Sequence, residues 1–241
     1  MAASPAMISV LIPVWRDRDS LAALLPLLRA APEVREVIVC AAHPAPDLAG
    51  WVEERGGRCV DGGAPNRGRQ MDLGAATASG PWLLFQHADT AITRAHLSAL
   101  ARVAEEFVGG AFYRRFDERH PALRWLEPVE RWHNRSFGAL YGDQSIFVRR
   151  ETFRALGGFR GLPLMEDVDF SLRLRRAGPL ALLDPSIASS PRKHLAQGPW
   201  RTTLTNAALL ALYHLGVSPA RLHAMYYRRM ASSGADFSHS S

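Results

Sequence analysis

Two short segments place carboxylates where they could hold a charged ligand or move a proton. His87-Ala88-Asp89 follows an apolar run that predicts a strand. A carboxylate at the end of such a strand suits a hard divalent cation, which takes oxygen ligands and can bridge two phosphates. His87 is a second candidate metal ligand beside Asp89. The same pattern also fits an aspartate that ends a strand and caps the next helix, so both interpretations stay open.

The second segment is Glu166-Asp167-Val168-Asp169, which places three acids in the first turn of a predicted helix. Acids at this position complement the helix dipole, but one is enough for that purpose and like charges repel. A carboxylate within hydrogen-bond reach of an acceptor hydroxyl can act as a general base. Asp167 and Glu166 are therefore candidate catalytic residues.

Basic and polar residues form three further candidate sites for an anion. Arg67, Arg69 and Gln70 open a predicted helix, where backbone N–H groups already favour negative charge, although a solvated basic turn has the same composition. Asp143 lies in a Tyr-Gly-Asp-Gln segment that also fits an ordinary turn. Arg201 follows the run Arg-Lys-His at 192–194, which could fold over a diphosphate or remain a solvated loop.

The elements that must position these residues alternate between strands and helices. Short apolar runs predict strands over 7–14, 36–40, 58–60, 82–86, 110–116 and 145–149. Helical spacing and end signals predict helices over 20–30, 48–55, 68–79, 93–107, 121–137, 150–156, 166–176, 202–215 and from 219 to about 230. This order predicts an α/β fold with a mainly parallel sheet flanked by helices, followed by C-terminal helices. The polar segments 15–19, 41–47, 61–69 and 87–90 should meet at the carboxyl edge of that sheet.

Length and composition fit one domain with an ordinary core. The chain has 241 residues, and 47% of them are hydrophobic. Residues 1–230 show no interdomain linker, and the polar stretch 231–241 predicts a disordered tail. The apolar positions of the helix over 202–215 suit a core or homodimer face better than a membrane anchor.

Charge and cysteine content indicate which kinds of binding partner and which cellular compartment to expect. The net charge is +6, and the only lysine is Lys193, so arginine supplies the basic side chains. Arginine grips phosphate in a bidentate way, which favours an anionic ligand or a peripheral membrane contact over a nucleic-acid groove. Cys40 and Cys59 form no metal-binding or redox motif, and the start of the chain lacks a signal-peptide pattern. These features predict a cytoplasmic protein without a transmembrane segment and without a nucleic-acid partner.

Taken in order, several motifs over residues 7–225 resemble family 2 glycosyltransferases of the GT-A (Rossmann-like) fold. They are Ser9-Val10-Leu11-Ile12-Pro13, Arg67-Gly68-Arg69-Gln70 with Gly74-Ala75, Leu83 to Thr90, Phe147-Val148-Arg149-Arg150 with Gly157-Gly158-Phe159, and Glu166 to Phe170. The sequence is most similar to a bacterial subfamily with LHADT-type, YGDQ-type and MEDVEF-type motifs. Members of that subfamily are named for radical-SAM/selenium gene sets or arsenosugar biosynthesis.

The resemblance implies a hexosyltransferase-type enzyme that uses a nucleotide-diphosphate sugar, with UDP-sugars favoured, and a small acceptor. Asp89 is similar to the last acid of the family's DxD motif, which holds Mg²⁺ or Mn²⁺ on the donor diphosphate. Asp167 resembles the general base of an inverting displacement, and Glu166 would shape that site. Pro13 and Val14 would border the nucleotide base. The two arginines of the Arg67-Gly68-Arg69 motif would lie near the nucleotide.

Two departures from the family pattern keep other functions open. His87 stands where the first acid of DxD is expected, and Ala41-Ala42 replaces an acidic turn that would contact the base or ribose; Asp61 is a candidate substitute. The missing acid supports a non-catalytic binding protein, but retention of Asp89 and Asp167 argues against it. A sugar-1-phosphate nucleotidyltransferase would usually need a glycine-rich phosphate loop after the first strand, and no glycine occurs there.

Overall fold

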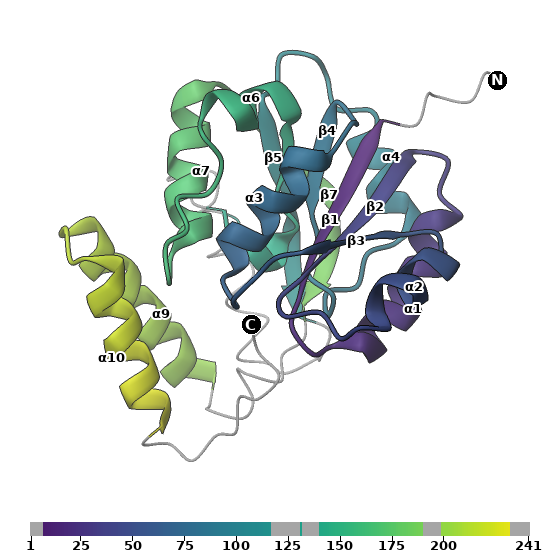
Figure 1. Ribbon diagram of the computed structural model, residues 1–241. Coiled ribbons are helices and arrows are strands. Elements are labelled where there is room, and N and C mark those ends of the chain that lie inside the picture. Colours follow the sequence, from purple (N-terminus) through teal and green to yellow (C-terminus); the bar gives the residue numbers. More distant parts are fainter. Residues whose placement is uncertain (1–6, 117–130, 132–139, 190–198, 232–241) are drawn as a thin grey trace.

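The computed structural model describes residues 7–116, 131, 140–189 and 199–231, and Figure 1 shows a central sheet with helices on both sides. The strands in this part of the chain are β1 (Ile8–Val14), β2 (Val34–Ala41), β3 (Arg58–Asp61), β4 (Trp82–Phe85), β5 (Gly109–Phe116), β6 (Phe147–Arg149) and β7 (Leu180–Ser189). Their order in the sheet is β3-β2-β1-β4-β6-β5-β7. β6 runs antiparallel to β4 and β5, and the other neighbouring pairs are parallel.

Helices cover both faces of the sheet, as expected for strands that are apolar along their whole length. One face is covered by α1 (Arg18–Arg29), α2 (Leu48–Glu54) and α4 (Arg94–Leu100). The other is covered by α3 (Arg67–Thr77), α6 (Arg150–Ala155) and α7 (Glu166–Ala177). All seven residues of β1 are buried, and alternate side chains face the two helical layers because strand side chains have a period of two.

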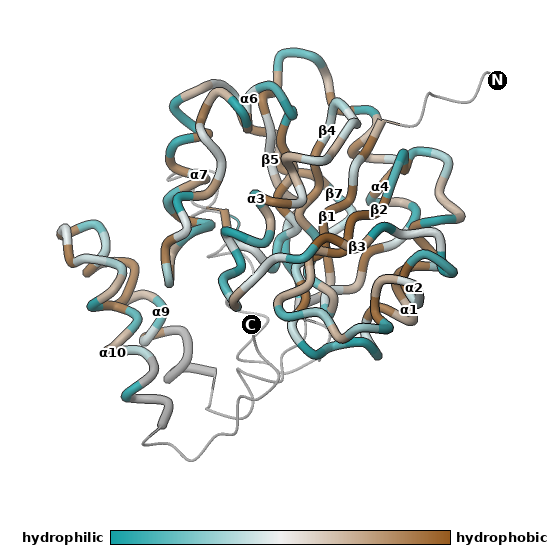
Figure 2. Tube along the Cα trace, viewed as in Figure 1, coloured by the Kyte–Doolittle hydropathy of each residue, from teal (hydrophilic) through white to brown (hydrophobic). Residues whose placement is uncertain are grey.

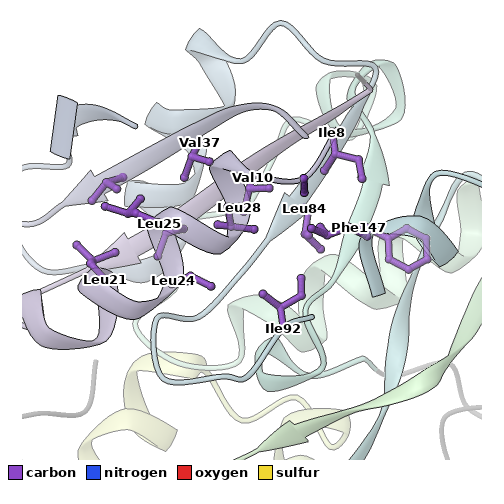
Figure 3. Packing of buried hydrophobic residues seen from close by; sticks show 14 of the residues in the cluster. Ile8, Val10, Leu21, Leu24, Leu25, Leu28, Val37, Leu84, Ile92 and Phe147 are labelled. Carbon is purple, nitrogen blue, oxygen red and sulfur yellow. The ribbon is translucent and has the colours of Figure 1, made fainter. Parts of the chain in front are cut away.

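The helical spacing of leucines in α1 produces one side of this core. Leu21, Leu25 and Leu28 are fully buried against β1 and β2, and Figure 3 shows them facing Val10 and Val37. Complete burial of a leucine side chain contributes roughly 1.5–3 kcal/mol, so this helix face holds α1 firmly on the sheet.

On the opposite face, a glycine allows α3 to approach the sheet closely. A Cβ atom at Gly74 would lie 2.2 Å from Sγ of Cys40 on β2 and 2.9 Å from Cδ2 of Leu11 on β1. No other residue fits there without moving the helix outward. Because Arg67 opens the same helix, this close packing also fixes how far Arg67 stands from the sheet edge.

Comparison with the sequence-based expectations confirms the mainly parallel α/β sheet and corrects two elements. The strand β7 was not predicted; it carries Pro185, which is tolerated because β7 is an edge strand. α4 ends at Leu100, seven residues before the predicted end, where the chain continues in turns such as Val103 N to Leu100 O. The predicted helix over 121–137 falls almost wholly outside the described residues, as does most of the predicted tail.

The chain continues beyond β7 into two C-terminal helices, α9 (Pro199–His214) and α10 (Pro219–Ala231). They pack against each other beside α7 and away from the sheet, at the yellow-green end of Figure 1. Tyr213 on α9 donates to Oδ1 of Asp169 on α7 over 3.3 Å, which ties the pair of helices to the domain. No helix in the part of the chain described here combines the length and the apolar character that crossing a membrane requires.

Candidate active site

The chemistry-bearing segments converge at one edge of the sheet. The carboxyl ends of β1 to β4 meet there because these strands are parallel, and the start of β6 reaches the same edge because β6 is antiparallel to β4. Backbone bonds join the loops that leave the strands: Ala42 N donates to Val14 O over 2.8 Å, and His43 N donates to Gly63 O over 3.0 Å. The predicted meeting of the segments 15–19, 41–47, 61–69 and 87–90 is therefore correct.

Asp167 is held by two backbone donors in the first turn of α7. Its Oδ2 accepts from Gly142 N over 2.7 Å, and its Oδ1 accepts from Val168 N over 2.8 Å. Burial raises the pKa of Asp167 to about 7, and the neighbouring Glu166 acts in the same direction. The N–H of Gly142 and the charge of Arg67 oppose this rise, but they do not cancel it. The result is a fixed carboxyl group that exchanges a proton near neutral pH.

Gly142 brings His87 and Asp167 to the same place. It opens the short 3-10 turn η1 (Gly142–Gln144) before β6. A Cβ atom at Gly142 would lie 2.8 Å from Nε2 of His87 and 3.5 Å from Oδ2 of Asp167. Burial and the nearby Arg67 lower the pKa of His87 to about 3, against the opposing charge of Asp143. His87 therefore presents a neutral imidazole, which is the form that ligates a metal.

Asp89 lies at the same edge, in the loop after β4. Its side chain reaches solvent, yet the surrounding protein removes enough water to raise its pKa. Arg67 lowers the pKa of Asp89, whereas Asp17 and Asp143 raise it, so all three charged groups lie near this carboxylate. Asp17 follows β1, and Asp143 lies in η1. Asp89 thus combines access to a ligand with partial loss of hydration, beside charged groups of both signs.

Arg67 is the cation that these groups share. It begins α3 after Asn66, whose Oδ1 caps the helix by accepting from Arg69 N over 2.9 Å. Its Nη1 lies 3.7 Å from Oε1 of Glu166, and its charge affects the pKa values of both Asp89 and Asp167. The two predicted key carboxylates, 78 positions apart in the numbering, therefore both lie within electrostatic reach of one arginine.

Two residues of this cluster were missed in the sequence. Arg114, near the end of β5, forms an ion pair with Oδ2 of Asp143. Tyr141 precedes η1, and burial together with the charge of Asp167 raises the pKa of its hydroxyl to about 12. The signal for Arg114 was a pair of arginines at the end of a predicted strand, and the signal for Tyr141 was its place in the Tyr-Gly-Asp-Gln segment beside Asp143.

The other predicted nucleotide-binding residues occupy varied positions. Pro13 and Val14 are buried at the end of β1. Gln70 is buried, and its Nε2 donates to Val14 O over 3.0 Å and to Cys40 O over 2.7 Å, so it joins α3 to β1 and β2. Arg69 is exposed on the first turn of α3. Arg201 lies in α9, but its side chain and the whole of 192–194 fall outside what the structure describes.

The position of the missing acid is occupied by small buried side chains. Ala41 and Ala42 are nearly inaccessible to solvent, and their methyl side chains offer no polar group to a ligand. Asp61 pairs with Ala41 in the β2–β3 register, which places it next to the gap. Its Oδ1 accepts from Gly63 N over 2.8 Å, and its side chain is exposed. Asp61 is thus positioned beside the missing acid and remains accessible.

Four non-glycine residues with positive φ surround this edge. They are Arg16 after β1 (59°), His43 after β2 (45°), Ser145 before β6 (50°) and Met165 before α7 (66°), and the rest of the described chain shows no others. This conformation is unfavourable for residues with a side chain and often occurs at functional sites.

A divalent cation at this edge would need further ligands from a bound diphosphate. No group of three or more histidine, cysteine, aspartate or glutamate side chains suited to a metal occurs within the described residues. Asp89 and the neutral His87 supply an oxygen and a nitrogen donor. Mg²⁺ is commonly held by one or two carboxylates together with substrate phosphates, so this sparse donor set is compatible with a cation carried by a diphosphate.

Solved structures with the same architecture include two sugar-transfer synthases. Mannosyl-3-phosphoglycerate synthase from Rubrobacter xylanophilus matches with a TM-score of 0.52 and 18% identity, over 76% of this chain and 66% of that one. Glucosyl-3-phosphoglycerate synthase from Mycobacterium tuberculosis, in complex with Mn²⁺, UDP and glucosyl-3-phosphoglycerate, matches with a TM-score of 0.55 and 17% identity, over 79% of this chain and 75% of that one.

A third similar structure is TarS from S. aureus, with a TM-score of 0.57 and 16% identity, over 77% of this chain and 37% of that one. The fold is that of GT-A glycosyltransferases. The chain spans about two thirds of the mannosyl-3-phosphoglycerate synthase and little more than a third of TarS. No protein-family model matches the sequence, and no curated protein matches it. The GT-A likeness therefore comes from three-dimensional structure, at identities below 20%.

Proposed function

We propose that the protein is a glycosyltransferase that moves a sugar from a nucleoside diphosphate donor to a small acceptor, with inversion at the anomeric carbon. The observation that carries the proposal is that one cation, Arg67, acts electrostatically on both Asp89 and Asp167. Asp89 is accessible and has lost part of its hydration, and Asp167 is half-buried and exchanges a proton near neutral pH. These are the properties needed to hold a donor and to activate an acceptor.

Asp167 serves as the general base. It accepts the proton of the acceptor hydroxyl, whose oxygen then bonds to the anomeric carbon from the face opposite the diphosphate. The bond between that carbon and the diphosphate oxygen breaks, and its electron pair leaves with the nucleoside diphosphate. A pKa of about 7 suits this role because a base works best when its pKa lies near the operating pH. The hydrogen bonds from Gly142 and Val168 hold the carboxyl in one orientation.

Asp89 and His87 serve the donor side. They are the residues that would hold Mg²⁺ or Mn²⁺, which when bound supplies positive charge to the leaving diphosphate. Arg67 adds a positive charge within electrostatic reach of both carboxylates, and Glu166 orients it through their 3.7 Å contact. Such preorganised charge stabilises negative charge that develops on a leaving group. Removing it should therefore affect turnover as well as donor binding.

The donor is a UDP-sugar in this proposal. Support comes from the similar glucosyl-3-phosphoglycerate synthase, whose structure holds UDP and Mn²⁺. Pro13 and Val14 would border the base, and Arg69 and Arg201 would lie near the phosphates. Asp61 would take over the contact that Ala41-Ala42 cannot make.

The deciding experiment measures thermal unfolding with UDP and with a panel of UDP- and GDP-sugars, each with and without Mn²⁺. A ligand at a hundred times its Kd stabilises the folded state by about 2.7 kcal/mol, or roughly 5–10 °C for a chain of this size. Asp89→Asn should abolish the Mn²⁺-dependent part of the UDP shift. Glu151→Gln, an exposed acid in the first turn of α6 at the opposite sheet edge, should keep it.

Product analysis separates the alternatives. Release of nucleoside diphosphate from a sugar donor supports the proposal. Release of pyrophosphate from a nucleoside triphosphate and a sugar 1-phosphate would instead identify a nucleotidyltransferase. Donor binding without hydrolysis or transfer across the panel would indicate a binding protein, and the absence of any nucleotide-dependent shift would refute a donor site at this edge.

A further inference from the structure

The positive charge of the protein is concentrated at one end of the chain. Residues 185–235 contain six arginines and lysines and no aspartate or glutamate. The whole chain has 29 basic and 23 acidic residues, so the remainder carries 23 of each and is electrically neutral. The entire formal net charge of +6 therefore belongs to the segment that contains α9 and α10.

The C-terminal hairpin, defined here as α9 and α10 (residues 199–231), exposes an apolar row. On α9 and just beyond its end, Leu204, Ala207, Ala208, Ala211 and Leu215 are all exposed. Their spacing of three and four residues places them on one helix face. Leu204 is 68% exposed and Leu215 is 80% exposed, values far from those of a core leucine.

The buried side of the hairpin is narrow. Between residues 204 and 226, the described side chains that are buried are Leu209 on α9 and Leu222 on α10. On α10, Met225 is 50% exposed, and Arg221 and Arg228 are exposed beside it. Figure 2 shows hydrophilic and hydrophobic segments alternating along both helices, at a distance from the brown core of the sheet. The hairpin thus offers apolar and basic side chains together to its surroundings.

We infer that the C-terminal hairpin docks on an anionic lipid surface. Exposed leucines and methionine enter the boundary of the acyl chains, and the arginines meet lipid phosphates, as in helices that lie in the plane of a membrane. α9 has 16 residues and is about 24 Å long, which is too short to cross a hydrocarbon core of about 30 Å. A second copy of the chain is a poorer partner because two surfaces of the same sign repel. A nucleic acid would leave the apolar row uncovered.

Vesicle flotation with the full chain tests this inference. Phosphatidylcholine vesicles with and without about a third phosphatidylglycerol are mixed with protein and floated in low salt. We expect the protein to float with the anionic vesicles only, and to be released at about 0.5 M salt, where screening is strong. Each arginine near an anionic surface contributes about fivefold in binding, so Arg221→Gln with Arg228→Gln should weaken binding about 25-fold.

A second double variant tests the apolar row. Leu204→Ser with Leu215→Ser should weaken binding at least roughly tenfold, because two large apolar side chains no longer leave water. The matched control is Leu27→Ser with Leu73→Ser, which changes two exposed leucines on α1 and α3 and should bind as the wild type does. Circular dichroism melting confirms that each variant folds, and hydrogen exchange of 204–228 with vesicles locates the contact independently.

Four results would overturn the inference: no flotation, equal flotation with uncharged vesicles, hairpin variants that bind as the wild type does, or control variants that lose binding equally. A salt-sensitive complex with a random DNA duplex, stronger than vesicle binding, would assign the charge to nucleic acid instead. A dimer in light scattering that Leu204→Ser with Leu215→Ser dissolves would assign the apolar row to a second copy. None of these readouts depends on catalysis, so they are separate from the test of the proposed function.

Discussion

Asp167→Asn tests the proposed base with little change in shape. The asparagine side chain has nearly the same volume, and its single carbonyl oxygen can accept from either Gly142 N or Val168 N, but not from both. The loss of one such bond costs about 1 kcal/mol. The variant therefore keeps the architecture of the first turn of α7 and loses the group that takes a proton.

The size of the effect follows from general base catalysis and from the pKa of Asp167. Removing a positioned base lowers turnover by about 10²–10⁴-fold. With a pKa of about 7, the wild-type carboxyl is about half ionised at pH 7 and about one tenth ionised at pH 6. The wild-type rate should therefore fall about fivefold from pH 7 to pH 6 and about tenfold for each further pH unit. The residual rate of Asp167→Asn should lose this dependence.

The assay measures release of nucleoside diphosphate between pH 5 and 9, with the donor found by thermal shift. Donor-induced stabilisation should persist in Asp167→Asn, and Glu151→Gln should match the wild type in rate and pH profile. The pH dependence of stability shows whether the variant has a folding defect. The raised pKa of Asp167 makes its contribution to stability greatest below pH 4 and lost as the pH rises through about 7. The asparagine variant should thus unfold no more easily than the wild type at pH 8. Near-full activity of Asp167→Asn, or an unchanged pH profile, would refute the assignment.

Two further predictions concern Gly142 of the candidate site and Glu36, a hydrogen-bonded residue of β2. Gly142→Ala should lower turnover at least about tenfold and cost about 1–3 kcal/mol of stability, because its Cβ would lie 2.8 Å from Nε2 of His87. The control is Gly50→Ala, whose Cβ would meet nothing within 4 Å, and it should keep the wild-type turnover and stability. Activity assays and urea unfolding measure the two effects. Glu36→Gln should lower the unfolding free energy by about 2 kcal/mol at pH 7. Although burial alone would raise the pKa of Glu36, its hydrogen bonds lower it to about 2, so this stabilisation is present above about pH 4.5 and lost as the pH falls through 2. Equal urea midpoints for wild type and Glu36→Gln at pH 7 would contradict that account.

The fold was predictable where a strand or helix carries its own pattern. β1 is a continuous apolar run and α1 has apolar positions at helical spacing, and both lie within two residues of their expected places. β7 has no such pattern, since Asp184 and Pro185 interrupt it; the strand forms because β5 offers a partner and because an edge strand tolerates proline. Such a partner can be known only once the sheet is assembled.

The sequence predicted which residues form the candidate site better than it predicted the contacts between them. The alternation of elements predicted the edge that holds Asp89, whereas the place of Asp167 beside it was implied only by the family resemblance. The contact between Gly142 N and Asp167 joins two segments 25 residues apart, and the Arg114–Asp143 pair joins two segments 29 residues apart. Both depend on the antiparallel course of β6, which a strand of only three residues, Phe147–Arg149, cannot reveal.

The ring of unfavourable backbone conformations at Arg16, His43, Ser145 and Met165 has an evolutionary consequence. A residue with a side chain pays about 1 kcal/mol for this conformation, which glycine adopts freely. Selection for heat resistance alone would thus favour glycine at these loop positions. Each such replacement would loosen a loop at the carboxyl edge of the sheet, so lineages adapting to higher temperature would gain stability there only by making the proposed donor site less rigid.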